Sequence, residues 1–172
     1  MAHRNTIWFY ATAILVVIID QLTKLIARSQ LVLDRPVPII KDVLDWRLVY
    51  NPAAAFGIGQ GFAPLLILVA LVAIFAIVRL RRLRNLSLGI SIGLGLLLGG
   101  AIGNLIDRLA FPSRGVTDFI DLSVKMGSYQ WPTFNVADIA IVAGAIIVLV
   151  IVYVIEKRQG DEGQSGQAEA DK

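Results

Sequence analysis

Four long apolar stretches dominate the pattern of hydrophobic and polar positions along the chain. They run from Ile7 to Ala27, from Phe62 to Val78, from Leu86 to Ile106 and from Val136 to Ile155. A helix that crosses a bilayer needs about 20 mostly apolar residues, and each stretch has this length or comes close to it. The pattern therefore predicts four transmembrane helices in a single membrane domain, residues 1–158.

Arginines indicate how these helices are oriented. Four of them lie between the second and third stretches: Arg79, Arg81, Arg82 and Arg84. Short loops rich in Lys and Arg stay in the cytoplasm, so this loop is expected there, together with both chain termini. The two longer polar segments, about 28–61 and 107–135, are then expected outside the cytoplasm.

Two segments differ from the helical pattern. Between Val43 and Tyr50, apolar and polar residues alternate, which is typical of a half-buried strand. We therefore expect an all-α integral membrane protein with a small extracytoplasmic β element. Residues 159–172 are rich in Gly, Gln, Glu and Asp and have no apolar period, which predicts a disordered cytoplasmic tail.

Composition narrows the possible chemistry. The 172 residues are 56% hydrophobic and 17% charged, with a mean hydropathy of +0.72. The absence of cysteine excludes disulfides, thiolate metal sites and a cysteine nucleophile. The single histidine, His3, lies in a polar terminus, which argues against serine–histidine and metal–histidine catalysis. The net charge of +3 is explained by arginines beside the membrane segments, and nothing indicates nucleic-acid binding.

Carboxylates, amides and one arginine gather at the expected outer surface of the membrane. Asp20 lies about 13 residues into the first stretch, which is roughly 20 Å along a helix of 1.5 Å rise. The other members lie at the outer helix ends or in the adjoining segments: Asn51, Asn104, Asp107, Arg108, Asp118, Asn135 and Asp138. Ionisable groups inside a membrane are costly, so such residues are candidates for function.

Structural roles account for some of these residues singly. Asp20 and Lys24 have the i, i+4 spacing of a helical ion pair. Asn135 followed by Asp138 resembles a helix-capping arrangement. The many glycines between Gly89 and Gly103 favour close helix packing in lipid. Packing and capping do not require all the polar groups to share one level.

Two carboxylates held close together can share one proton, so that one acts as a base and the other as an acid. The base activates water and the acid protonates a scissile carbonyl, which is aspartic-peptidase chemistry and needs no metal or organic cofactor. The residues alone do not choose the pair among five candidates: Asp20, Asp107, Asp118, Asp121 and Asp138.

Two other classes of protein also place polar residues in a membrane. A small transporter or channel subunit would carry them along a whole path, whereas the inner halves of these stretches are almost purely apolar. A non-enzymatic anchoring protein would use the glycine-rich helix for docking and its carboxylates only as caps. Such a protein would tolerate Asp118→Asn, and a peptidase would not.

Five blocks of sequence resemble bacterial lipoprotein signal peptidase, the type II signal peptidase, in the order found in that family. The blocks are Asp20–Lys24, Asn51–Gly57, Gly99–Arg108, Val116–Ile120 and Phe134–Asp138. The resemblance implies that Asp118 and Asp138 form the catalytic dyad, with Asp121 outside it. It implies supporting roles around the substrate for a further set: Asp20, Lys24, Asn51, Asn104, Asp107, Arg108 and Asn135.

The resemblance also implies a substrate and a location. The substrate would be a prolipoprotein whose cysteine carries diacylglycerol, cut just before that cysteine. The enzyme would lie in the bacterial cytoplasmic membrane with its active site near the outer face. Its partners would be prolipoproteins and membrane lipid, with no nucleic acid and no obligate protein partner.

Overall fold

The computed structural model describes the backbone of residues 2–52, 63–83, 86–122, 125–126 and 129–170. Within these residues, four helices and five strands follow one another along the chain. They are α1 (Ala2–Gln30), β1 (Val37–Ile40), β2 (Leu44–Asn51), α2 (Ala63–Leu83), α3 (Leu88–Ala110), β3 (Val116–Leu122), β4 (Lys125–Met126), β5 (Tyr129–Gln130) and α4 (Val136–Ala170).

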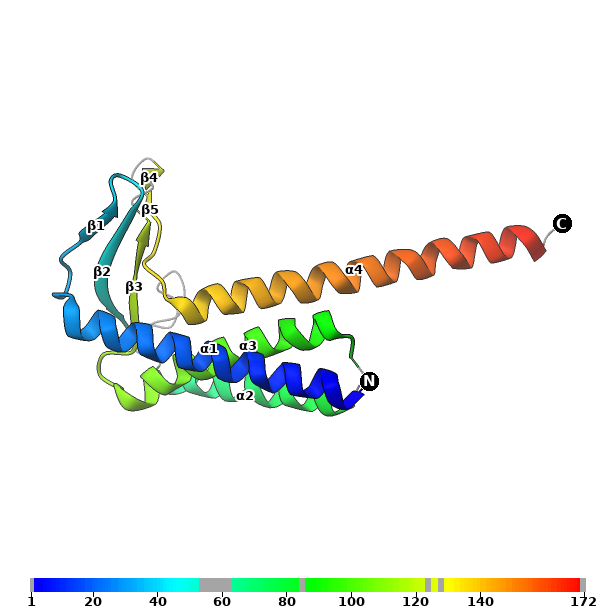
Figure 1. Ribbon diagram of the computed structural model, residues 1–172, viewed down its shortest axis with the longest axis horizontal. Helices are drawn as coiled ribbons and strands as arrows, with labels where there is room; N and C mark the ends of the chain where they lie inside the picture. The colour runs from blue at the N-terminus through cyan, green and yellow to red at the C-terminus, as the bar shows by residue number, and fades with distance from the viewer. Residues whose placement is uncertain (1, 53–62, 84–85, 123–124, 127–128, 171–172) are drawn as a thin grey trace.

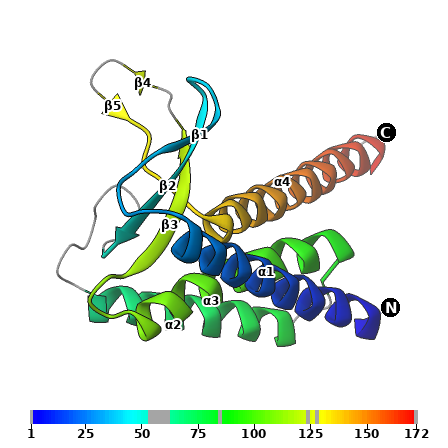
Figure 2. The same ribbon diagram turned by 60° about the vertical axis from the view of Figure 1, so that its left-hand side comes forward.

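The helices lie side by side, and the sheet lies across one end of them (Figure 1). Both chain termini lie toward the opposite end (Figure 1). Figure 2 shows α3 between α1, α2 and α4, and α3 contacts all three. All four helices are long and apolar enough to cross a membrane, which confirms the predicted spans.

Small residues on α3 allow its neighbours to approach closely, as the packing interpretation predicts. A Cβ on Gly99 would lie 2.7 Å from the carbonyl oxygen of Ala13 in α1. A Cβ on Gly100 would lie 2.5 Å from the carbonyl oxygen of Ala137 in α4. The two glycines therefore bring α1 and α4 against α3 at the level where the polar side chains lie.

A three-stranded antiparallel sheet of order β1-β2-β3 forms the predicted β element. In it, Asn51 pairs with Val116 and Asp45 pairs with Asp121. β3 was not predicted as a strand because its residues are buried on both faces and show no simple alternation. An isolated bridge between Ile120 and Phe134 connects β3 to the segment that leads into α4.

All four helices run beyond their predicted C-terminal ends, α2 and α4 the furthest. Arginine is a good helix former with a long stem, so α2 continues to Leu83 and carries Arg79, Arg81 and Arg82 on its last turns instead of in a loop. Arg84 lies outside the described residues. The backbone of α4 is helical to Ala170, where a disordered tail was expected from residue 159.

Candidate active site

Asp118 projects from the middle of β3 and is held by two amide side chains. Asn51, at the end of β2, donates from Nδ2 to Asp118 Oδ2 at 3.1 Å. Asn135 donates from Nδ2 to Asp118 Oδ1 at 2.6 Å. Burial, reinforced by the charge of Asp138, raises the pKa of the Asp118 carboxyl to about 7, although the two amide hydrogen bonds oppose the rise.

Asp138 lies in the first turn of α4 and has its own pair of donors. Asn104 of α3 donates from Nδ2 to Asp138 Oδ1 at 2.8 Å. The backbone N–H of Asn135 donates to Asp138 Oδ2 at 3.1 Å. The N-terminal end of α4 also directs the positive end of its helix dipole toward Asp138.

Asn135 connects the two carboxylates. Its side-chain amide reaches Asp118, its backbone N–H reaches Asp138, and its Oδ1 accepts the N–H of Asp138 at 3.0 Å. The side chain of Asn135 is fully buried. Because one residue contacts both carboxylates, Asp118 and Asp138 are held in a fixed relation to each other.

A buried ionic cluster lies behind Asn104. Lys24 donates to Asn104 Oδ1 at 2.9 Å and pairs with Asp20 at 2.9 Å, which confirms the predicted i, i+4 ion pair. Lys24 also lies 3.6 Å from Asp107. Because Lys24 occupies the oxygen side of the Asn104 amide, the nitrogen side faces Asp138.

The two acids of this cluster also bind backbone N–H groups of the elements that carry the dyad. Asp20 accepts the N–H of Ala137, at the start of α4, at 3.0 Å. Asp107 accepts the N–H of Thr117, which precedes Asp118, at 2.8 Å. The cluster therefore fixes α4 and β3 as well as neutralising charge.

Arg108 completes the polar group at the outer end of α3. It donates to the carbonyl oxygen of Asn104 at 3.3 Å. It also interacts electrostatically with Asp107, Asp118 and Asp138. A fixed positive charge beside two carboxylates reduces their mutual repulsion.

Both carboxylates face a cavity of about 660 Å³. Asn51, Asn104 and Arg108 also line it. The remaining wall is mostly apolar, with contributions from two segments: Trp131, Pro132 and Phe134 before α4, and Ile139, Val142 and Ile146 along one face of α4. The cavity can therefore hold an apolar chain with its polar end at the two carboxylates.

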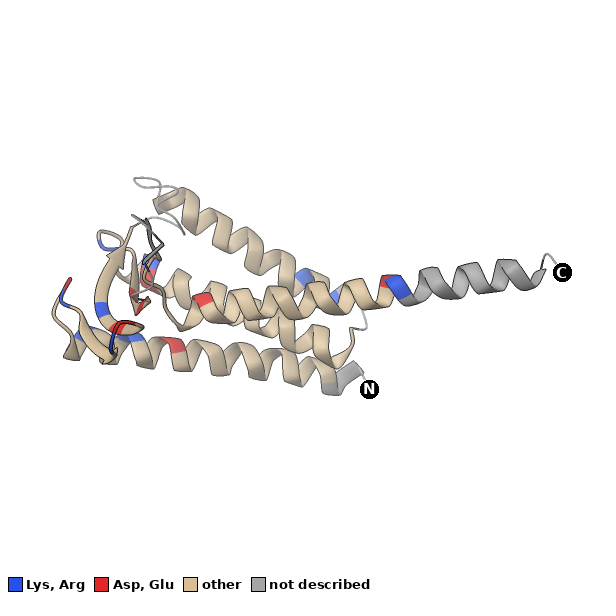
Figure 3. Cartoon of the chain, turned by 90° about the horizontal axis from the view of Figure 1, so that it is seen from above, with Lys and Arg blue, Asp and Glu red and all other residues tan. Residues whose placement is uncertain are grey.

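The structure brings together every residue predicted for the site: Asp20, Lys24, Asn51, Asn104, Asp107, Arg108, Asp118, Asn135 and Asp138. Asp121 is separate from them. It is buried, lies 3.5 Å from Arg47 and does not line the cavity. Figure 3 shows most of the acidic and basic residues around the sheet and the adjoining helix ends, with others on α2 and α4 toward the opposite end.

Sequence reasoning missed three residues that support this arrangement: Gln21, Arg28 and Thr117. Gln21 donates to Asp20 and to the carbonyl oxygen of Gly103, both at 3.1 Å. Arg28 donates to Thr117 Oγ1 at 3.0 Å. The polar character of Gln21 within an apolar span was the available signal, whereas the Arg28–Thr117 contact depends on tertiary structure.

Known proteins resemble the chain over most of its length. A family profile described as "Signal peptidase (SPase) II" matches residues 12–154. The lipoprotein signal peptidase of Rhodococcus jostii is 39% identical over 156 residues, covering 88% of this chain and 75% of that protein. That of Halothermothrix orenii is 35% identical over 148 residues, covering 86% of this chain and 97% of that protein.

Solved structures agree with the fold. A bacterial membrane enzyme determined by the in meso method at 2.3 Å superposes with a TM-score of 0.75 at 28% identity, covering 84% of this chain and 87% of that one. A second bacterial membrane enzyme, at 1.9 Å, gives a TM-score of 0.72 at 29% identity, covering 84% and 91%.

Proposed function

The chain belongs to the signal peptidase II family, and on this premise we propose that Asp118 and Asp138 are its catalytic dyad. The protein is an aspartic endopeptidase that removes signal peptides from prolipoproteins. This function replaces the transporter and anchoring alternatives. The assignment of the dyad rests on one observation: both carboxylates face one cavity and are linked through Asn135.

Asp118 carries the shared proton and Asp138 is the base. Burial of Asp118 within β3 favours its neutral form, and its pKa of about 7 keeps it mostly protonated below neutral pH. We assign the base to Asp138, which accepts two N–H donors at the start of a helix, close to Arg108. The two environments therefore assign different roles to two chemically identical groups.

The reaction conserves the single proton of the dyad. Asp138 takes a proton from water, the water oxygen bonds to the scissile carbonyl carbon, and Asp118 gives its proton to the carbonyl oxygen. The resulting gem-diol collapses, returning one hydroxyl proton to Asp118. The peptide C–N bond breaks as Asp138 gives its proton to the leaving nitrogen, which restores the starting state.

The substrate is a prolipoprotein whose cysteine carries diacylglycerol, and cleavage occurs just before that cysteine. The apolar wall of Ile139, Val142 and Ile146 follows one face of α4 from the dyad into the membrane. Acyl chains lying on this wall place the lipidated residue at the two carboxylates. They also exclude bulk water from the site, which strengthens its electrostatic interactions.

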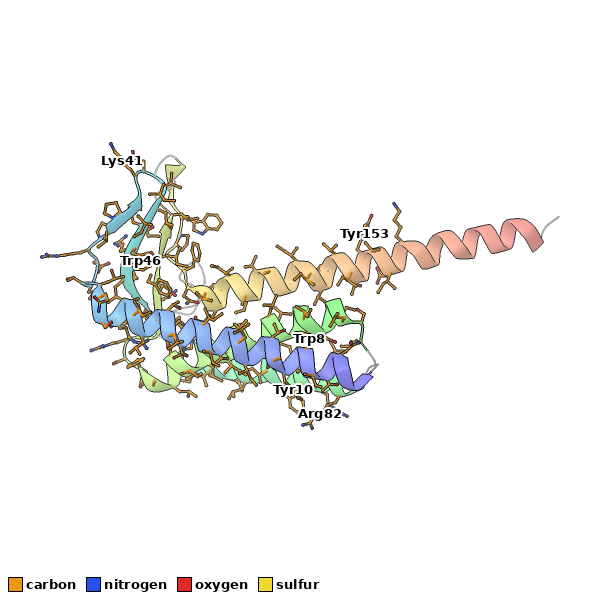
Figure 4. All side chains as sticks on the ribbon, viewed as in Figure 1. Trp8, Tyr10, Lys41, Trp46, Arg82 and Tyr153 are labelled. Atoms are coloured by element: carbon orange, nitrogen blue, oxygen red, sulfur yellow. The ribbon has the colours of Figure 1, made fainter. Side chains whose placement is uncertain are left out.

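The active site lies at the outer face of the bacterial cytoplasmic membrane, and both termini are cytoplasmic. Arg79, Arg81 and Arg82 end α2, and the positive-inside rule assigns that end to the cytoplasm. Figure 4 shows Arg82 at the end of the bundle opposite Trp46. Trp8, Tyr10 and Tyr153 lie toward the Arg82 end (Figure 4), as aromatic residues near a membrane surface do.

The substrate is tested with purified protein in lipid nanodiscs and two forms of one precursor, with and without diacylglycerol on the cysteine. Mass spectrometry identifies the cleaved bond. We expect cleavage before the lipidated cysteine and at least a hundredfold slower cleavage of the unlipidated form, because the latter leaves the apolar wall empty. Equal rates for the two forms would show that the lipid is not recognised.

A further inference from the structure

We infer that Gly115 is a positioning residue for the reaction, because a residue without a Cβ is needed there for Asn51 to reach Asp118. This inference rests on the proposed role of Asp118. Gly115 precedes β3 and lies outside the set of polar groups that line the cavity.

Gly115 lies against the backbone of the segment that carries Asn51. A Cβ on Gly115 would overlap the carbonyl oxygen of Asn51, and it would lie 2.6 Å from Pro52 Cα and 2.7 Å from the Asn51 carbonyl carbon. All three atoms belong to the backbone, so no side-chain rotation can remove the overlap. Gly115 also has a φ of +79°, which L-residues other than glycine rarely adopt.

Contacts on both sides prevent Gly115 from moving away. Its N–H donates to the carbonyl oxygen of Phe111, just after α3, at 2.8 Å. The next residue, Val116, pairs with Asn51 in the sheet. The preceding residue, Arg114, lies over the ring of Tyr50 at 5.2 Å from its centroid. Arg114 and Val116 therefore hold Tyr50 and Asn51, and Phe111 holds Gly115 between those two contacts.

The amide of Asn51 is the end of this chain of contacts. It donates to Asp118 Oδ2 at 3.1 Å, on the strand that Gly115 begins. A side chain at residue 115 separates the two segments and removes this donor from Asp118. Other groups that act on Asp118 come from elsewhere: Asn135 and Asp138 at the start of α4, Lys24 on α1 and Arg108 on α3.

Loss of the Asn51 donor shifts the pKa of Asp118 in a definite direction. The Asn51 hydrogen bond lowers the pKa of Asp118, so its removal raises that pKa above about 7. Asp118 must be protonated to act as the acid, so the alkaline limb of the activity profile moves to higher pH. The maximal rate falls, because a displaced carboxyl no longer meets the scissile carbonyl at the required distance.

The test uses Gly115→Ala and Gly115→Asn, with Gly89→Ala as the matched control. Asparagine tolerates positive φ and keeps the backbone conformation accessible, so Gly115→Asn separates the contact from the conformation. At Gly89 a Cβ would meet only the side-chain tip of Ile151, 2.6 Å away. Thermal unfolding establishes the folded fraction of each variant, and kcat is expressed per folded enzyme.

We expect both Gly115 variants to lose kcat about a hundredfold, the size of effect that a misplacement of about 1 Å produces. Their alkaline limbs should move upward together with that of Asn51→Ala, while Gly89→Ala matches wild type. The double variant Gly115→Ala/Asn51→Ala should be no slower than the slower of the two single variants, since Gly115 acts through Asn51.

The inference is overturned if Gly115→Asn has wild-type kcat and pH profile, or if the losses of the two single variants multiply in the double variant. Failure of the proposed dyad is a separate result. It would appear as activity retained by Asp118→Asn, whatever the Gly115 variants do.

Discussion

Asn135 and Asp138 bind each other in both directions at the start of α4. The Asn135 N–H donates to Asp138 Oδ2 at 3.1 Å, and the Asp138 N–H donates to Asn135 Oδ1 at 3.0 Å. This is a capping box, and it uses the Asp138 carboxylate assigned to catalysis. The Asn135 amide then donates to Asp118 at 2.6 Å, so the helix cap and the arrangement of the dyad share the same residues.

Capping and catalysis can be separated at Asn135. Serine also caps helices well but is too short to replace the hydrogen bond to Asp118. Both Asn135→Ser and Asn135→Ala lose the buried amide hydrogen bonds to Asp118 and Asn104 and should lose most activity, but the serine variant keeps the cap and should be about 1 kcal/mol more stable than the alanine variant. Thermal unfolding and cleavage rates in the same detergent measure both effects. Wild-type activity in Asn135→Ser would show that Asn135 acts only as a helix cap.

Activity should fall as pH rises through about 7. Asp118 is the acid, its pKa is raised to about 7, and its deprotonation leaves no proton for the carbonyl oxygen. The profile of kcat/KM with pH, measured on a lipidated precursor, should therefore show an alkaline limb close to neutral pH. A rate that stays flat well above pH 7 would contradict the assignment of the proton to Asp118.

The stability of the protein should depend on the balance of charge in the buried cluster of Asp20, Lys24 and Asp107. Lys24→Met leaves Asp20 and Asp107 without the cation between them, and breaking a buried pair in this way costs about 3–5 kcal/mol. Replacing one acid as well, in Lys24→Met/Asp20→Asn, should recover part of that loss. Thermal unfolding of the two variants beside wild type decides this. A single variant as stable as wild type would mean that the cluster does not hold the fold.

The apolar wall should determine substrate affinity more than the chemical step. Val142→Asn places an amide on the wall and should raise KM for the lipidated precursor at least tenfold with a smaller change in kcat. Leu149→Asn is the control, because Leu149 is exposed on α4 and does not line the cavity. Equal effects of the two variants on KM would show that the apolar wall does not bind the substrate.

The membrane helices could be predicted from the sequence because apolar length alone defines a span. The ends were less predictable: α2 includes Arg82 because an arginine stem can lie along an apolar helix while its charge reaches water. β3 was missed as a strand although Val116, Thr117 and Ile120 are β-branched, because Asp118 and Asp121 interrupt the apolar pattern. A strand that carries a buried carboxylate does not show the usual alternation.

The level of the polar residues was also predictable, because helical rise converts sequence position into depth. Their partners were not. The binding of Asp20 to the N–H of Ala137 and of Asp107 to the N–H of Thr117 depends on how helices and strands pack. The close approach of Gly115 to Asn51 is likewise visible only in three dimensions.

The central claim is that Asp118 and Asp138 are the dyad, and Asp121 provides the control within the same strand. Asp121 is as buried as Asp118 but does not face the cavity. The decisive measurement compares cleavage of a lipidated precursor by Asp118→Asn, Asp138→Asn and Asp121→Asn, each normalised to folded protein. We predict a loss of at least a thousandfold for the first two and less than tenfold for the third. Near-wild-type cleavage by either of the first two variants would contradict the dyad.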